Sequence, residues 1–208
     1  MGFGYPLGID LPGEKRGMIP NDKYYDKNYN GSWNGLTIIS IAIGQGEVTA
    51  TPLQMANLGA TIANRGYFIT PHVVKEVEDE ALDSLYTTKR YTKVREEHYE
   101  TVVQGMRAAV TGGTCRAANL PGLDVCGKTG TAQNRGKDHS AFMGFAPMNN
   151  PKIAVAVYVE NGGWGATYGV PIGALIMEKY LNGELSAQSE LKAQDIQMRR
   201  IDYGVHER

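Results

Sequence analysis

Residues 122–134 read GLDVCGKTGTAQN, and the way this stretch is interpreted decides which fold the chain adopts. From Gly122 to Thr129 it matches G-x-x-x-x-G-K-T, the pattern of a phosphate-binding loop in nucleotide hydrolases. From Lys128 to Gly130 it also reads K-T-G, a triplet found in enzymes that attack peptides through an activated serine. The two patterns require opposite surroundings, so the neighbouring sequence distinguishes between them.

The surroundings do not suit a phosphate-binding loop. Such a loop has to follow a buried parallel strand and open directly into a helix, whose N-terminus then faces the phosphates. The segment before Gly122, CRAANLP, does not resemble a buried strand, and GTAQNRGKD after Thr129 contains turn residues where the helix should begin. The alternation of strands and helices typical of nucleotide hydrolases is also missing. A nucleotide hydrolase is therefore the least favoured hypothesis.

The surroundings do suit a strand followed by further strands. Residues 123–133, 139–146 and 152–159 each read as an extended segment, and turn residues separate them. Three strands joined by short loops predict an antiparallel meander. Residues 168–181 read as a helix that packs back on this sheet. The pattern predicts an α+β fold.

Two helices are predicted ahead of the sheet. Thr51 is a good N-cap, Pro52 suits the first helical position, and Gln54 completes a capping box. Apolar residues then follow up to Gly66, which ends the helix. Residues 95–110 form a second amphipathic pattern.

The remaining segments carry weaker signals. Residues 1–35 read as loop, and the apolar run 36–43 reads as a buried strand or the start of a helix. Residues 67–77 look extended, and residues 78–93 look like a polar segment that leaves the core and returns to it. Residues 184–208 form a charged, peripheral tail with some helical character.

Composition excludes several classes of function. The chain has 208 residues, enough for one domain or most of one, and its net charge of −1 indicates no nucleic-acid partner. No run approaches the ~20 apolar residues that span a bilayer, and the N-terminus does not resemble a secretion signal. Cys115 and Cys126 have no histidines at ligand spacing, so zinc is not indicated. We expect free thiols, with a disulfide as the alternative in an oxidising compartment.

Four segments in order carry a resemblance to a known family: GIDLPGE (8–14), IGQGEVTATPLQMA (43–56), GKTGTAQN (127–134) and HSAFMGFAP (139–147). Together they resemble the class B penicillin-binding proteins, D,D-transpeptidases that cross-link peptidoglycan, especially those of the cell-elongation machinery. The resemblance implies the transpeptidase fold shared with serine β-lactamases, an antiparallel sheet flanked by helices. It also implies a protein at the periplasmic face of the inner membrane.

The resemblance assigns roles to the residues around K-T-G. Lys128, Thr129 and Gly130 would form the third active-site motif, with Lys128 near the serines of the other two motifs. Thr129 and Thr131 would hold the carboxylate of the substrate or of a β-lactam, and the backbone N–H of Thr131 would supply half of the oxyanion hole. The implied substrate is a stem peptide ending in D-Ala-D-Ala, and the implied partner is a glycan polymerase. No cofactor or metal is implied.

The residues themselves support this chemistry without the family. An edge strand can pair with an extended peptide through main-chain hydrogen bonds, and Gly130 lets a substrate approach closely. Threonine hydroxyls can bind a carboxylate, and Lys128 adds positive charge that helps proton transfer.

The other family motifs are absent. The family uses S-x-x-K, which contains the nucleophilic serine, followed by S-x-N and then K-T-G. The only S-x-x-K here, Ser189 to Lys192, lies after K-T-G in the polar tail. The S-x-N letters at Ser32 to Asn34 lie after GIDLPGE, whereas the family has this motif upstream of it. We interpret both matches as coincidental.

We therefore expect residues 1–182 to be the C-terminal portion of a transpeptidase domain and residues 183–208 to be a polar tail. The fold would be incomplete, lacking the N-terminal part with the nucleophile helix, and the chain would be inactive alone. The alternatives are a non-catalytic penicillin-recognising sensor or interaction module and, with less support, a serine β-lactamase. We expect a structural hydrogen-bonding role for His139 and partial burial for Trp33 and Trp164.

Overall fold

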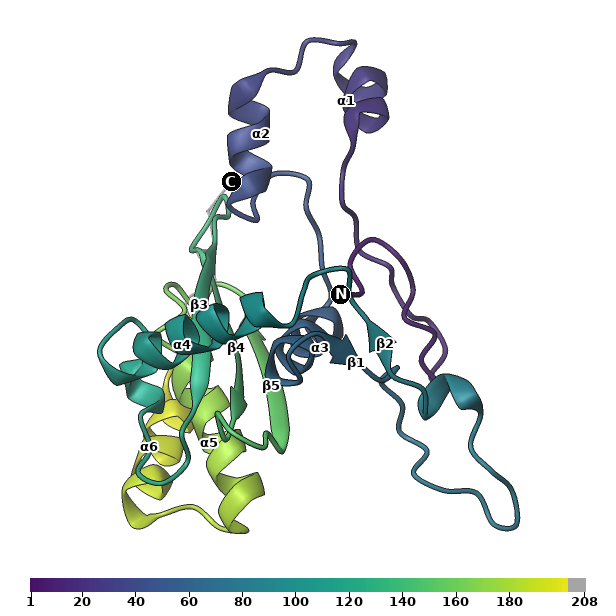
Figure 1. The fold of residues 1–208 in the computed structure, drawn as a ribbon. Helices are drawn as coiled ribbons and strands as arrows, with labels where there is room; N and C mark the ends of the chain where they lie inside the picture. The colour runs from purple at the N-terminus through teal and green to yellow at the C-terminus, as the bar shows by residue number, and fades with distance from the viewer. Residues whose placement is uncertain (202–208) are drawn as a thin grey trace.

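The computed structural model describes residues 1–201, and its centre is a three-stranded antiparallel sheet (Figure 1). The strands are β3 (Cys126–Ala132), β4 (His139–Ala146) and β5 (Ile153–Val159), in the order β3-β4-β5. Lys128 lies opposite Met143 and Thr129 lies opposite Phe142. The predicted meander is confirmed, with strand β4 matching its predicted range at both ends.

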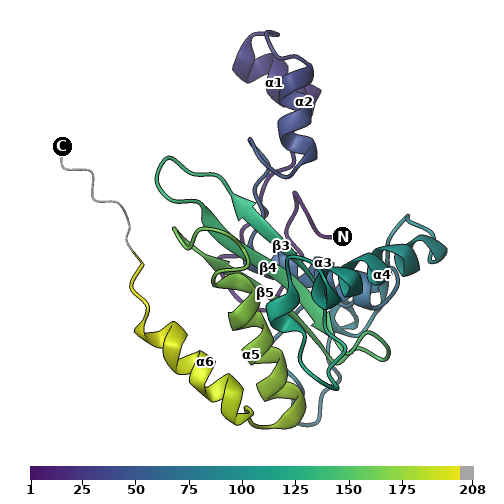
Figure 2. The same ribbon diagram turned by 90° about the vertical axis from the view of Figure 1, so that its left-hand side faces the viewer.

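Helices cover both faces of the sheet, as Figures 1 and 2 show. Helix α5 (Gly169–Asn182) packs on one face, and α3 (Pro52–Ala63) and α4 (Glu97–Thr111) pack on the other. Because side chains alternate along a strand, the two faces have separate cores. Phe142 belongs to the core under α5, and Phe145, three residues later, belongs to the core shared with α3 and α4.

Small residues make the core around Phe142 possible. A Cβ added at Gly127 or at Gly173 would lie 2.5 Å from the Phe142 ring, so only glycine fits at both positions. Phe142 is fully buried between strand β3 and helix α5. Interiors packed to this density tolerate little change in volume.

Helix α3 begins at the predicted cap and anchors the start of the chain. The Thr51 hydroxyl accepts a hydrogen bond from the Gln54 N–H, and the Gln54 side chain accepts one from the Thr51 N–H, which confirms the capping box. The Gln54 amide also donates to the carbonyl oxygens of Gly2 and Arg16, at 2.7 and 2.8 Å. One buried side chain therefore holds the N-terminal loop against the sheet domain.

The segment between this loop and α3 forms a projecting arm, which differs from the prediction (Figure 1). Residues 1–35 are not all loop, since helix α1 (Asp22–Tyr29) begins at an Asn21 cap. The apolar run 36–43 was expected to be a buried strand or the start of a helix. It forms helix α2 (Gly35–Ala42), which confirms the helical alternative, but Leu36 is 75% exposed. Burial was not found because an apolar run is buried only where another element lies against it.

A second extension follows α3. Residues 67–77 were expected to be extended, but only β1 (Tyr67–Phe68) is a strand, paired antiparallel with β2 (Arg90–Tyr91). The residues between these strands contain the short 3-10 helix η1 (Ser84–Tyr86) and an isolated antiparallel bridge between Val77 and Glu80. Another 3-10 helix, η2 (Arg116–Ala118), follows α4.

The predicted C-terminal tail contains a helix, in keeping with its expected helical character, and residues 202–208 of this segment lie outside the described residues. Helix α6 (Ala187–Met198) is capped by Ser186 and packs against α5. The buried Glu178 carboxylate of α5 accepts a hydrogen bond from the Ser186 N–H at 3.1 Å. None of the helices within residues 1–201 is long and apolar enough to cross a membrane.

Both cysteines are free and buried, in agreement with the prediction. Cys115 belongs to the core under α5, whereas Cys126 belongs to the core under α3 and α4. Burial raises the pKa of Cys126 to about 11, so this thiol is uncharged at neutral pH.

Candidate active site

The predicted site lies on strand β3, which is at the edge of the sheet. Within residues 1–201, β3 pairs only with β4, so its other edge has no strand beside it. Lys128 is exposed on this strand, and the three residues that follow it are half-buried. An edge strand with exposed backbone groups can pair with an extended peptide.

Successive side chains of β3 point to opposite faces of the sheet, so the threonines of the motif lie on one face and the lysine lies on the other. Thr129 and Thr131 lie on the same face of the strand as the core under α5, whereas Lys128 and Gly130 lie on the other face. The Thr129 hydroxyl is 2.9 Å from the hydroxyl of Thr114, and the Thr131 hydroxyl accepts a 3.4 Å hydrogen bond from the Gly165 N–H. Hydrogen bonds thus hold two threonine hydroxyls on the same face of β3, with one residue between them.

The loop between β5 and α5 packs directly against these threonines. A Cβ added at Gly165 would lie 2.6 Å from the Gly130 carbonyl oxygen and 3.0 Å from the Thr129 Cβ. The Ser140 hydroxyl of β4 donates to the Trp164 carbonyl at 2.8 Å and accepts from the Gly169 N–H at 3.0 Å. Close packing and two hydrogen bonds therefore fix the backbone of this loop beside the K-T-G strand.

Gln45, which lies just after α2, contacts the open edge of β3. Its side-chain amide donates to the Thr131 carbonyl oxygen at 3.2 Å. The N–H and C=O of one residue in an antiparallel strand point to the same side, so this contact indicates that the Thr131 N–H also points away from β4. An N–H directed at the open edge is what an oxyanion hole on this strand needs.

The Lys128 side chain is held close to the motif. Its ammonium donates to the Thr129 carbonyl oxygen at 2.8 Å, on the exposed side of the strand. The positive charge consequently stays within reach of any group bound at the open edge.

The two serine-containing matches lie elsewhere. Ser32 is in the turn between α1 and α2, in the arm. Ser189 is buried on helix α6 beneath the Glu178 carboxylate, and α6 packs on α5 (Figure 2). Within the part of the chain that the structure describes, no S-x-x-K pair accompanies the K-T-G strand.

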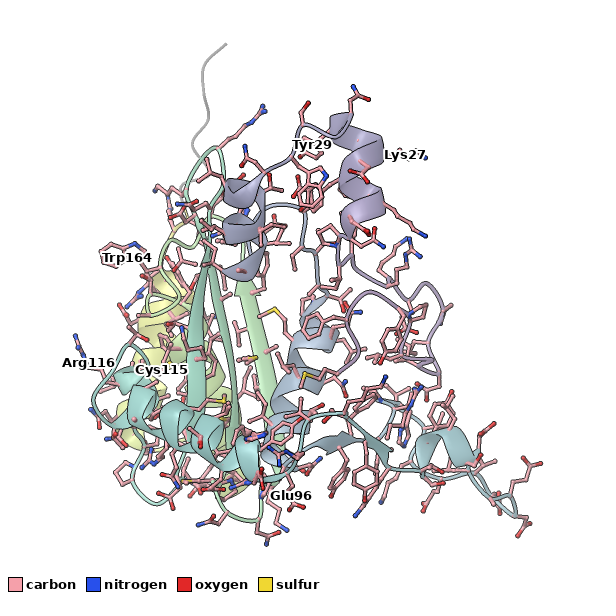
Figure 3. The ribbon with its side chains drawn as sticks, turned by 45° about the horizontal axis from the view of Figure 1, so that its top comes forward. Lys27, Tyr29, Glu96, Cys115, Arg116 and Trp164 are labelled. Carbon is pink, nitrogen blue, oxygen red and sulfur yellow. The ribbon has the colours of Figure 1, made fainter. Side chains whose placement is uncertain are left out.

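The predictions for the aromatic residues had mixed outcomes. His139 accepts a hydrogen bond from the Asn161 N–H at 3.0 Å through Nδ1, which confirms a structural role. Trp33 is half-buried, as predicted, and donates to the Asp26 carboxylate at 2.8 Å. Trp164 was expected to be partly buried but is 74% exposed, and Figure 3 shows it pointing away from the sheet.

Sequence reasoning missed three residues of this site: Ser140, Gly165 and Gln45. All three lie in segments with detectable signals, because Ser140 is within HSAFMGFAP, Gln45 is within IGQGEVTATPLQMA and Gly165 is within a glycine-rich turn. Gln45 lies 86 positions from Thr131, and no local pattern predicts a contact over that separation.

Comparisons with known proteins agree with this fold. The model of the penicillin binding protein transpeptidase domain matches residues 1–180. The chain is 35% identical to the peptidoglycan D,D-transpeptidase MrdA of Acinetobacter baumannii, over 80% of this chain and 28% of that protein. It is also similar to the crystal structure of Pseudomonas aeruginosa PBP2 in complex with WCK 5153. That likeness has 36% identity and a TM-score of 0.76, and it covers 90% of this chain and 42% of that one.

A further structural neighbour is a peptidoglycan synthase complex described as coordinating polymerisation and cross-linking, with 30% identity and a TM-score of 0.72 over 89% of this chain and 32% of that one. The fold is that of the transpeptidases in these structures. The chain belongs to the penicillin-binding protein transpeptidase domain family. It spans 28% to 32% of the length of the first three curated relatives that it matches.

Proposed function

We propose that this chain supplies the K-T-G side of a peptidoglycan D,D-transpeptidase site. Thr129 and Thr131 bind the terminal carboxylate of a stem peptide ending in D-Ala-D-Ala, and the Thr131 N–H stabilises the oxyanion. The observation that carries the proposal is the contact from Gln45 to the Thr131 carbonyl, because it indicates that Thr131 directs its backbone groups to the open strand edge.

The reaction assigns each group a step. A serine hydroxyl attacks the carbonyl carbon of the penultimate D-Ala, and the negative charge that develops on its oxygen is stabilised by backbone N–H groups. The C–N bond to the terminal D-Ala then breaks, and that D-Ala leaves with a proton on its amine. An amine of a second stem peptide attacks the acyl-serine, which forms the cross-link and releases the serine. Lys128 provides the positive charge that helps to organise proton transfer beside Thr129.

The serine itself is not contributed by a motif that precedes Lys128 in this chain, so the proposal requires it from another part of the protein. β-Lactams would bind through the same carboxylate contacts. The proposed partner is a glycan polymerase, supported by the similarity to a synthase complex that couples polymerisation to cross-linking. The proposed location is the periplasmic face of the inner membrane, where peptidoglycan is cross-linked.

The proposal is tested by labelling membranes of the source cells with fluorescent penicillin and probing the same gel lanes with an antibody against this chain. We expect a band heavier than 22.7 kDa that carries both signals, and labelling should disappear when excess unlabelled penicillin is added first. An antibody-reactive band at 22.7 kDa without label would overturn the enzymatic proposal and favour a non-catalytic module. A labelled band at 22.7 kDa would show that the nucleophile lies within these residues.

The role of Thr131 is tested in the labelled protein with Thr131→Val. Loss of a hydrogen bond to a charged carboxylate should slow acylation by about tenfold or more. Thr111→Val is the matched control, because Thr111 is exposed at the end of α4. Equal acylation rates for the two variants would remove Thr131 from the site.

A further inference from the structure

Helix α6 and the residues after it lie outside the region that matches the transpeptidase domain model, which ends at residue 180. The start of α6 is fixed by the hydrogen bond from the Ser186 N–H to the buried Glu178 carboxylate. The helix then packs against α5, and the chain after it contacts the loop between β5 and α5 (Figure 2). This C-terminal segment therefore reaches the same loop that packs against the K-T-G strand.

The contact is made by Arg199, at the C-terminal end of α6. Its guanidinium donates to the Thr167 carbonyl oxygen at 3.1 Å, and its central carbon lies 5.6 Å from the centre of the Tyr168 ring. The same guanidinium donates two hydrogen bonds to the Asp195 carboxylate, at 2.5 and 3.0 Å. Because Asp195 lies one helical turn before Arg199, helix α6 itself orients the planar fork of donors towards the loop.

The Thr167 carbonyl needs a donor from outside the loop. The residue four positions later is Pro171, which has no N–H, so helix α5 cannot supply the usual helical donor to this carbonyl. Ser140 holds the loop on either side of Thr167 but does not contact this carbonyl. The hydrogen bond from Arg199 therefore restrains the middle of the loop.

A tight turn connects this contact to the K-T-G strand. The Thr167 N–H donates to the Trp164 carbonyl at 2.8 Å, which closes a four-residue turn. The second residue of the turn, Gly165, donates its N–H to the Thr131 hydroxyl. Arg199 thus holds one end of a turn whose other end contacts Thr131.

The direction of the Thr131 hydroxyl depends on this turn. A hydroxyl has one donor and two acceptor positions, and the Gly165 N–H occupies one acceptor position. The hydroxyl proton is then left to donate to a carboxylate at the open edge of the strand. At 3.4 Å the bond from Gly165 is near the limit of hydrogen-bond length, so a shift of a few tenths of an ångström in the turn breaks it.

We propose that Arg199 is a positioning residue for the transpeptidase site. It holds the Thr167 carbonyl, and through the turn before it keeps the Thr131 hydroxyl directed at the substrate carboxylate. Asp195 orients Arg199 for this role. The inference rests on the proposed function, because that function assigns the carboxylate to Thr131.

The test measures how fast the purified protein, as the cells make it, is acylated by fluorescent penicillin at concentrations well below saturation. We expect Arg199→Ala to be acylated about threefold to fivefold more slowly than the native protein, as for the loss of an exposed charged contact. Arg199→Lys keeps the charge but lacks the fork that reaches Asp195 and Thr167 together, so it should be slowed nearly as much. Thermal unfolding of each variant is measured alongside.

Two further variants separate positioning from simple attraction of the anionic penicillin. Arg200→Ala is the matched control, because it removes the same charge from the adjacent exposed residue and should leave the rate unchanged. Asp195→Asn removes a negative charge, so attraction alone would speed acylation. Positioning predicts the opposite, since Arg199 loses the carboxylate that orients it.

A double variant tests the route through Thr131. Arg199→Ala should have no further effect in the Thr131→Val background, because the hydroxyl through which it acts is gone. A full effect of Arg199→Ala in that background would overturn the inference.

The remaining outcomes separate the two proposals. Arg199→Ala that melts at a lower temperature but is acylated at the native rate has a structural role only, which overturns the inference and leaves the proposed function standing if Thr131→Val is slow. Equal slowing in Arg200→Ala, or faster acylation of Asp195→Asn, would show a general charge effect and also overturn the inference alone. A native protein that is not labelled, or that is acylated no faster than Thr131→Val, would overturn both.

Discussion

The sheet domain and the projecting arm use similar residues in different ways. Phe142 in β4 is completely buried, whereas Leu36 and Ile43 at the two ends of α2 are 75% and 71% exposed. The arm is instead held by polar contacts, in which Tyr25 and Tyr29 both donate to the Glu47 carboxylate. Apolar residues alone therefore do not produce a core, because they are buried only where another apolar surface packs against them.

The strongest way to test this comparison is to truncate one apolar residue in each region. Phe142→Ala removes a buried ring held between Gly127 and Gly173, so we expect a loss of about 3–5 kcal/mol in the free energy of unfolding. Leu36→Ala should change it by less than about 0.5 kcal/mol, because the side chain is exposed. Chemical denaturation followed by circular dichroism measures both. Similar losses for the two variants would show that the arm packs on something in solution.

A second prediction concerns close packing beside the K-T-G strand. In Gly165→Ala the new Cβ would lie 2.5 Å from the Ala141 carbonyl oxygen, so the loop must move, at a cost of about 1–3 kcal/mol. Gly105→Ala in helix α4 is the control, since a Cβ there meets nothing within 4 Å and should stabilise the helix by about 0.5–1 kcal/mol. Thermal unfolding of the two variants should therefore shift in opposite directions.

The third prediction addresses the polar contacts of the arm. Hydrogen bonds from Tyr29 and Tyr25 lower the pKa of Glu47, and the stabilisation that this provides is present above the ordinary pKa of a glutamate. It is lost as the pH falls through the lowered value in the folded state. Limited proteolysis should therefore cut the arm faster in acid, well below pH 4.5, than at pH 7.

Glu47→Gln supplies the control for this pH dependence. The variant should be cut at a rate that does not change over the same acid range, because the amide does not titrate. Burial and the bond to Glu47 also raise the pKa of Tyr25 to about 12, so the variant should show a tyrosine that ionises at lower pH by ultraviolet titration. An unchanged tyrosine titration would contradict this account of the arm.

The smallest effect is expected at the point where the two regions meet. Gln45→Ala removes one neutral hydrogen bond to the Thr131 carbonyl, which is worth about 0.5–1.5 kcal/mol. Hydrogen exchange at β3 and in the arm should increase, while exchange in α5 should not. Faster exchange throughout the sheet would mean that the arm supports the whole domain.

The sequence predicted the parts of the molecule that depend on local patterns. Strands β3, β4 and β5, the Thr51 cap of α3 and helix α5 follow from periodicity, turn residues and capping, each of which acts over a few residues. Helix α1 was missed because its eight residues have only one buried side chain, Tyr25, and therefore no apolar stripe.

The parts that could not be predicted depend on contacts between distant segments. The exposure of Trp164 follows from the packing of Gly165 against β3, which no pattern within the loop indicates. The contact from Gln45 to Thr131 and the contact from Arg199 to the Thr167 carbonyl each combine segments far apart in the chain. The roles of the K-T-G residues remain predictions until substrate binding is measured.

The hydrogen bonds of Ser140 bear on which substitutions the loop before α5 can accept. Its single hydroxyl holds the Trp164 carbonyl and the first N–H of α5, so the path of the loop depends on backbone groups and not on the side chain at position 164. Position 164 can therefore accept different side chains without altering the loop around it. Substituting residue 164 alone should give variants of similar stability, because its side chain is exposed, which makes this position a natural point for divergence among relatives and for directed evolution.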